Sequence, residues 1–151
     1  MDVTVLLKDS RDDVLQQANA ALSSAHTVHY DASGESFTQQ RLAGLYDLVL
    51  DAIDRRDLSA VDGYAHDVAV ERFNAGFDIS EVQLAFSSLE AAMWRCIVAA
   101  EPGDELADAV GLLSTVLGAA KDCLAQTYVS LASKRHVPTL DLSALFKGAS
   151  S

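Results

Sequence analysis

The chain has few residues that interrupt a helix, with only two prolines and eight glycines among its 151 residues. Half of its residues are hydrophobic, which is too many for an intrinsically disordered protein. Alanine and leucine are abundant, and both favour helix over strand. This composition predicts an all-α fold, and the length is sufficient for a single domain with one hydrophobic core.

Cysteine and basic residues are also scarce. The two cysteines, Cys96 and Cys123, do not form a C-x-x-C pair, so the sequence indicates two buried free thiols and excludes a disulfide framework. Eleven basic residues stand against 22 acidic ones, which gives a formal net charge of −11. Because nucleic acids bind to clustered basic surfaces, we expect no nucleic-acid partner.

No hydrophobic run approaches the roughly 20 residues that cross a bilayer. The apolar stretch from Val3 to Leu7 is too short for the core of a signal peptide and comes after an acidic residue. We therefore expect a cytoplasmic protein with no membrane partner. The stretch itself fits a short strand, a first helical turn or an arm that packs on a neighbour, and the sequence does not choose among the three.

The motifs of common active sites are missing as well. There is no Ser-His-Asp or Cys-His arrangement, no glycine-rich phosphate loop and no metalloprotease spacing, so we do not expect an enzyme. His26, His29 and Asp31 can supply metal ligands, but one loop with three donors is a weak metal signature. A haem needs a histidine that faces an apolar pocket, and neither His66 nor His136 fits that role. We expect no metal and no cofactor.

Apolar residues recur at helical spacing in five segments, which predicts a bundle of five main helices within residues 1–135. The expected positions are about residues 10–25, 38–53, 59–76, 79–100 and 104–134, with Ser10, Ser59 and Asp104 as N-caps. We expect residues 136–151 to form a tail with a short amphipathic turn. The expected core has nine inward-facing side chains: Val49, Ile53, Val68, Phe73, Phe86, Leu89, Ile97, Val110 and Leu117.

A sharp corner between the third and fourth helices is specified by the sequence from both sides. Gly76 can adopt the left-handed conformation that ends a helix, and Phe77 is the apolar residue that packs back on the last turn. Asp78 then starts the next helix, and Glu81 stands three residues later as in a capping box. The rest of the chain is expected to pack against this corner, to which Arg72 also belongs.

The corner resembles a motif in the N-terminal domain of RsbR-type stressosome co-antagonist proteins and of some bacterial sensor kinases. The resemblance is strongest from Ala65 to Ile97, and it continues from Val14 to Leu131 only as helix order and length. It implies a globin-like, haem-free dimer that acts as a signal-input module, with a separate signalling protein as its output. The residues that carry the resemblance are Arg72, Gly76, Phe77, Ile79, Glu81, Val82, Phe86, Leu89 and Trp94.

Two groups of residues, a set of aromatic side chains and His66, can be interpreted either as functional sites or as ordinary structural residues. Aromatic and methionine side chains can line a pocket for a small apolar ligand, but at helical spacing such residues more often form ordinary core. His66 lies in a helix as in histidine phosphotransfer domains, which is the alternative function, although Ala69 and Val70 stand where those domains place a lysine and a small residue. The pocket candidates are Tyr64, Phe73, Phe86, Met93 and Trp94.

The last long helix has a wide apolar surface. One seam of leucine and valine residues runs along it at spacings of mostly four and three, and a second stripe lies beside the seam. A surface this wide suggests two neighbours, so we expect a homodimer in which Gly111 and Gly118 allow close approach. The candidate interface residues are Leu106, Val110, Leu113, Leu117 and Leu124.

Overall fold

The computed structural model describes residues 2–24, 35–100 and 103–136. Within these ranges the chain forms six α-helices and no strand, which confirms the predicted all-α fold class. The helices are α1 (Val3–Asp9), α2 (Arg11–Ser24), α4 (Glu35–Arg55), α5 (Ser59–Asn74), α6 (Ile79–Ala100) and α7 (Gly103–His136). The globin-like arrangement and the division at residue 135 remain predictions.

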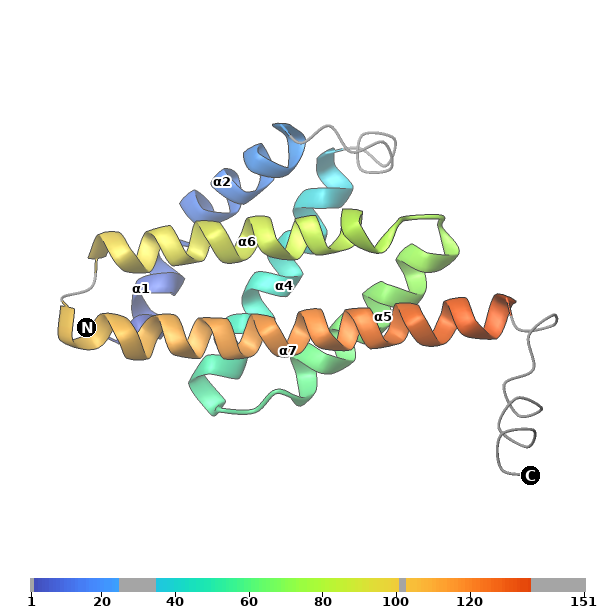
Figure 1. Ribbon diagram of the computed structural model, residues 1–151. Coiled ribbons are helices and arrows are strands. Elements are labelled where there is room, and N and C mark those ends of the chain that lie inside the picture. Colours follow the sequence, from blue (N-terminus) through green and yellow to red (C-terminus); the bar gives the residue numbers. More distant parts are fainter. Residues whose placement is uncertain (1, 25–34, 101–102, 137–151) are drawn as a thin grey trace, which may run out of the picture.

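The two longest helices form one side of the molecule. In Figure 1, α6 and α7 run side by side in opposite directions, with α4 and α5 behind them. Helix α7 packs most extensively on α5 and α6, whereas α2 packs on α6 and α4. The short α1 contacts α4 and α6. Because α4 also contacts α7, all the helices surround one interior.

A single hydrophobic core draws on all six helices. Seven of the nine predicted core side chains are buried with at most 6% of their surface exposed. The other two, Phe73 and Val110, are partly buried and pack against the core. Burial of these side chains removes apolar surface from water and stabilises the fold. The spacing of apolar residues therefore located most of the core correctly.

The segment that the sequence left open is a helix. Asp2 caps α1, because its Oδ1 accepts a hydrogen bond from the Thr4 amide at 2.9 Å. The hydroxyl of the buried Tyr46, on α4, donates to the carbonyl oxygen of Leu7. Both the local cap and this bond from α4 hold the segment as a helix of the core, so the strand and arm interpretations are wrong.

Two of the predicted N-caps are wrong. Helix α5 begins at Ser59 without a side-chain cap from the preceding Leu58. Instead, Asp57 Oδ1 accepts from the Ser59 amide at 2.9 Å and from its hydroxyl at 2.7 Å. Asp104 lies inside α7, which begins one residue earlier. Helix α5 therefore contains the expected cap as its first residue, and α7 begins one residue before the expected cap.

Candidate functional site

The corner between α5 and α6 begins with a Schellman motif. Gly76 has φ 90°, the left-handed conformation that glycine adopts without steric cost. Its amide donates to the Phe73 carbonyl at 3.1 Å, and the Phe77 amide donates to the Arg72 carbonyl at 3.0 Å. These two bonds satisfy carbonyl groups that would otherwise lack partners at the end of α5. The geometry matches the role that the sequence assigned to Gly76.

On the other side of the corner, Glu81 reaches back to the start of α6. Its Oε1 accepts from the Asp78 amide at 3.0 Å, and the Glu81 amide donates to the Asp78 carbonyl at 3.0 Å. This is the return bond of a capping box. The turn from Gly76 to Glu81 is therefore fixed by short-range bonds at both ends.

Arg72 connects the corner to α4. Its side chain is only 4% exposed, and its guanidinium carbon lies 4.8 Å from the centre of the Phe77 ring. A cation over an aromatic face is attracted by the negative charge on that face, and more strongly where water is excluded. Arg72 Nη1 lies 3.6 Å from Glu71 Oε1, and the other Glu71 oxygen pairs with Arg41 of α4. Arg72 thus links the corner to the exposed ion pair between Glu71 and Arg41.

Tyr128 connects the same corner to α7. Its hydroxyl donates to the Phe77 carbonyl at 2.9 Å, and its ring meets the Phe73 ring edge-on with centres 5.5 Å apart. The sequence analysis missed Tyr128. The spacing of the leucine seam could have indicated it, because Tyr128 stands four residues after Leu124 and three before Leu131. This spacing places Tyr128 on the inward face of the helix.

The five residues proposed to line a ligand pocket are not gathered around one cavity. Tyr64 and Phe86 line a cavity of about 20 Å³ between α4, α5 and α6, which is room for roughly one water. Met93 is fully buried in the core, Trp94 is 45% exposed, and Phe73 contacts Tyr128 instead. A ligand larger than water would have to move side chains to enter.

Tyr64 is held at the edge of this cavity. Its hydroxyl donates to the Arg41 carbonyl at 2.9 Å, and burial raises its pKa above the ordinary value. The same hydroxyl lies near Gly44, where a Cβ would come within 3.2 Å of it. The hydrogen bond to the backbone of α4 therefore fixes the position of the Tyr64 ring at this cavity.

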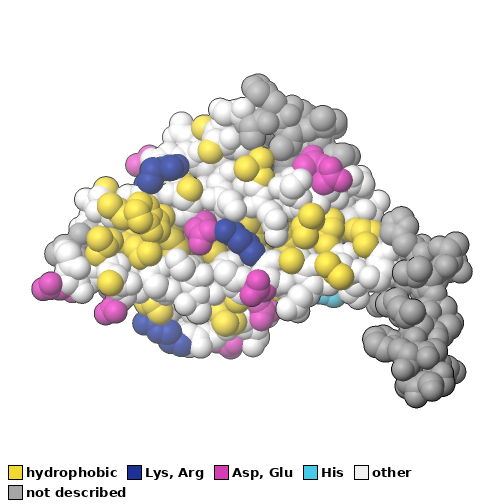
Figure 2. Space-filling view, in the orientation of Figure 1, with side chains coloured by type: hydrophobic (Ala, Val, Ile, Leu, Met, Phe, Trp, Pro, Cys, Tyr) yellow, Lys and Arg dark blue, Asp and Glu magenta, His cyan; other side chains and the backbone are white. Residues whose placement is uncertain are grey.

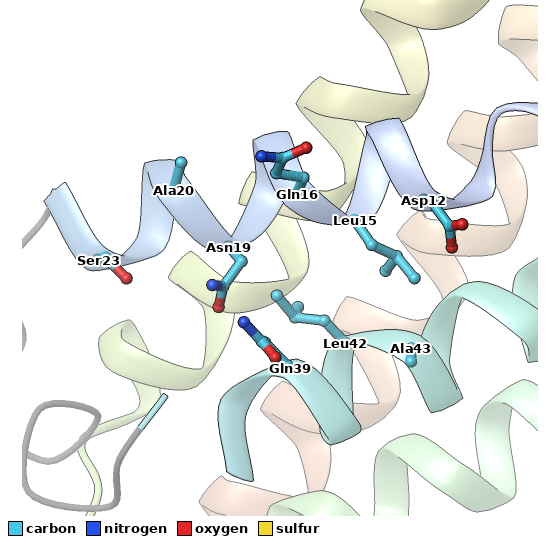
Figure 3. A pocket seen from close by; sticks show the side chains of 9 residues that line it. All are labelled: Asp12, Leu15, Gln16, Asn19, Ala20, Ser23, Gln39, Leu42 and Ala43. Atoms are coloured by element: carbon cyan, nitrogen blue, oxygen red, sulfur yellow. The ribbon is translucent and has the colours of Figure 1, made fainter. Parts of the chain in front are cut away.

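A larger hollow lies between α2 and α4, and no pattern in the sequence indicated it. It has a volume of about 690 Å³, and Figure 3 shows Leu15 and Leu42 in it beside the amide groups of Asn19 and Gln39. The chain that joins these two helices, including the proposed metal ligands His26, His29 and Asp31, lies outside the described residues. Among the residues that are described, no group of three or more His, Cys, Asp or Glu side chains could hold a metal ion.

Exposed hydrophobic side chains gather on the side formed by α6 and α7. Figure 2 shows two groups of them over these helices. Trp94 and Val98, one turn apart on α6, are 45% and 39% exposed, and Val129 on α7 is 64% exposed. Glu90 of α6 forms an ion pair with Lys121 of α7. Tryptophan is enriched at protein–protein interfaces, because its large ring is apolar and its N–H group can still reach a polar partner, so these side chains mark a candidate contact surface.

The predicted dimer residues divide into two groups. Leu113, Leu117 and Leu124 have no exposed surface within the single chain, because they pack into its core. They cannot also form the contact surface of a second copy in this conformation, so that part of the prediction is corrected. Leu106 and Val110 are partly buried at the edge of the core.

His66 lies exposed on α5, and its Nδ1 is 3.3 Å from Thr127 Oγ1 on α7. The Thr127 hydroxyl donates its hydrogen to the Cys123 carbonyl at 2.7 Å. Since that hydrogen is already used, Nδ1 must be the donor in the bond between the two side chains. In the neutral ring this leaves the lone pair on Nε2.

Comparison with protein families matches residues 12–135 to the family described as RsbT co-antagonist protein rsbRD N-terminal domain. No curated protein and no solved structure matches the chain. Among the described helices, none is long and apolar enough to span a membrane. The match covers most of the 151 residues, including all of α4, α5 and α6 and the corner that first indicated the resemblance. The chain therefore belongs to the family of RsbT co-antagonist N-terminal domains.

Proposed function

We propose that this protein is a cytoplasmic signal-input module that works by binding other proteins and not by catalysis. The observation that carries the proposal is the exposure of large apolar side chains on α6 and α7, namely Trp94, Val98 and Val129. The chain has a net charge of −11 and therefore many acidic side chains that could occupy surface positions. On α6 and α7, however, some surface positions are occupied by tryptophan and valine. Family membership adds the context of a signalling assembly.

The first partner in this proposal is a second copy of the chain. Pairing through a twofold axis brings the same patch together from both subunits and removes Trp94 and Val98 from water. Aromatic side chains near the centre of an interface commonly carry much of the binding energy. The Glu90–Lys121 pair lies on the same two helices.

Sedimentation tests this interface. At micromolar concentration the wild type should sediment as a dimer, and Trp94→Glu should sediment as a monomer, because charge would be buried without a partner. Val5→Glu is the matched control, since Val5 is 50% exposed on α1, outside the proposed contact. A monomeric wild type, or a Trp94→Glu variant that stays dimeric, contradicts the proposed dimer.

The second partner is a separate signalling protein. The family name points to an RsbT-type protein or to another of its antagonists. Calorimetric titration of the chain with the RsbT-type protein of the same organism, alone and together with the other antagonist, should give a saturable complex. Absence of binding in both titrations would remove this part of the proposal while leaving the dimer untouched.

A small apolar ligand is a further element of the proposed input. The cavity beside Tyr64 and Phe86 is the place where such a molecule could enter after side chains move. Short-chain alcohols should raise the melting temperature if the cavity opens for them. Val68→Ile, which adds one methyl group at the wall of the cavity, should reduce that rise; equal shifts in both proteins would speak against this site.

The alternative function is histidine phosphotransfer through His66. Its support is the exposed ring with Nδ1 as donor to Thr127, which leaves Nε2 as the nucleophilic nitrogen. Incubation with acetyl phosphate distinguishes the two functions. An acid-labile phosphoryl group that is absent from His66→Gln would favour phosphotransfer, whereas an unmodified wild type supports the binding module.

A further inference from the structure

Two successive residues of α7 are bonded to α5 and to the α5–α6 corner. Thr127 lies against His66 of α5, and Tyr128 donates to the Phe77 carbonyl. Beyond this point α7 continues to His136, and Val129, the next residue, is 64% exposed. The last part of α7 is thus anchored to the body by contacts that precede it directly.

Phe77 is held by two different parts of the molecule. Its ring lies under the Arg72 guanidinium, and its carbonyl oxygen accepts from Tyr128. The backbone between the two helices is fixed by Gly76 at φ 90° and by the Phe77–Arg72 bond. A displacement of Arg72 therefore moves the acceptor on which Tyr128 depends.

The other end of these contacts lies at the surface. Arg72 is 4% exposed, but Glu71 beside it is 41% exposed and pairs with Arg41, which is 38% exposed. A partner with a charged side chain can reach this ion pair from solvent. The contacts from Arg41 through Glu71, Arg72 and Phe77 to Tyr128 are continuous.

We infer that these five residues form a relay through which binding at the exposed Arg41–Glu71 pair changes the packing of the last part of α7. The inference rests on the proposed signal-input function, because it names the route of the signal within that module. A relay of this kind needs two arrangements of the element at its end. In this structure α7 is bonded to the corner, and the proposal adds a second state in which α7 is released.

Amide hydrogen exchange of the full chain tests the α7 end of the relay. Tyr128→Phe removes one buried hydrogen bond and should raise exchange about threefold to tenfold in residues 129–133 and around the Phe77 amide. Tyr46→Phe is the matched control, because Tyr46 is also buried and donates to a helix-end carbonyl, that of Leu7 in α1. It should raise exchange in α1 alone.

The surface end is tested by Glu71→Gln, which removes the charge and keeps the size of the side chain. Exchange in residues 129–133 should rise severalfold, although Glu71 makes none of the bonds described for α7. Asp51→Asn breaks another exposed ion pair, that with Arg55 on α4, and should leave these residues at the wild-type rate.

Unchanged exchange at residues 129–133 in Glu71→Gln, or a uniform rise throughout the chain in Tyr128→Phe, would overturn the relay. Neither experiment requires a partner protein. A failure of the relay is therefore distinguishable from a failure of the proposed binding function, which is measured by sedimentation and titration.

Discussion

Two helix junctions in this protein use the same backbone geometry with different residues. The α4–α5 junction has Arg56 at φ 56°, and the α5–α6 corner has Gly76 at φ 90°. In both, the next amide reaches back five residues, from Asp57 to Ala52 at 3.3 Å and from Phe77 to Arg72 at 3.0 Å. The left-handed turn is therefore available to a residue with a side chain, at a cost of roughly 1–2 kcal/mol that glycine avoids.

The two junctions differ in the residue that comes directly after the left-handed one. Arg56 offsets part of its strain with a hydrogen bond from its guanidinium to the Ile53 carbonyl, and the next residue, Asp57, is exposed. At the corner the next residue is Phe77, which is buried. The first junction is a solvated turn and the second is part of the core, so mutations should affect them unequally.

The largest expected effect is at Phe77. Phe77→Ala should lower the free energy of unfolding by about 3 kcal/mol, because it empties a buried site and removes the ring under Arg72. Denaturant melts measure this directly. Phe77→Leu keeps most of the buried volume and should lose clearly less; equal losses in the two variants would mean that the corner requires the aromatic ring itself and not only the buried volume.

Gly76→Ala should cost about 1–2 kcal/mol, because alanine must then occupy a left-handed conformation. Gly63→Ala on α5 is the matched control. A Cβ at Gly63 meets no atom within 4 Å, and alanine is the better helix former, so this variant should gain about 0.5–1 kcal/mol. If the two changes had the same sign in thermal melts, the positive φ of Gly76 would not determine its role.

Asp57 should make the solvated junction sensitive to acid. The hydrogen bonds from Ser59 hold the pKa of Asp57 below its ordinary value of 3.8. A lowered folded-state pKa stabilises the protein fully above the ordinary value, and the stabilisation is lost as the pH falls through the folded value. The difference in melting temperature between wild type and Asp57→Ala should therefore shrink from about pH 6 to about pH 3. A difference that is constant with pH would exclude the carboxylate as the cap.

The smallest effect is expected at Arg56. Arg56→Gly should stabilise the protein by about 0.5 kcal/mol, since relief of the left-handed strain exceeds the lost bond to Ile53 and the added freedom of the unfolded chain. Arg55→Gly, one residue earlier and inside α4, should instead destabilise by about 1 kcal/mol. Chemical denaturation of the pair checks both signs; a destabilised Arg56→Gly would show that the guanidinium bond outweighs the strain.

Local sequence was sufficient to predict five of the six described helices, most of the core and the α5–α6 corner. These features depend on neighbours within a few residues: the spacing of apolar side chains, glycine at a left-handed position, and Glu81 three residues after Asp78. The same local pattern indicated the family, which the match to residues 12–135 confirms. Even so, the left-handed Arg56 was not predicted, because arginine has no preference for that conformation.

The packing of the helices, by contrast, sets which apolar side chains remain at the surface. In the sequence, the leucines of α7 and Trp94 of α6 are both apolar residues in a predicted helix. In the structure, Leu117 is fully buried and Trp94 is 45% exposed. The exposure of each side chain depends on how each helix is rotated relative to its neighbours. The spacing of apolar residues predicts that a helix has an apolar face, but it does not predict how much of that face is covered. For the same reason the Tyr128 bond to Phe77 joins residues 51 positions apart, which only the packing of α7 on the corner brings together.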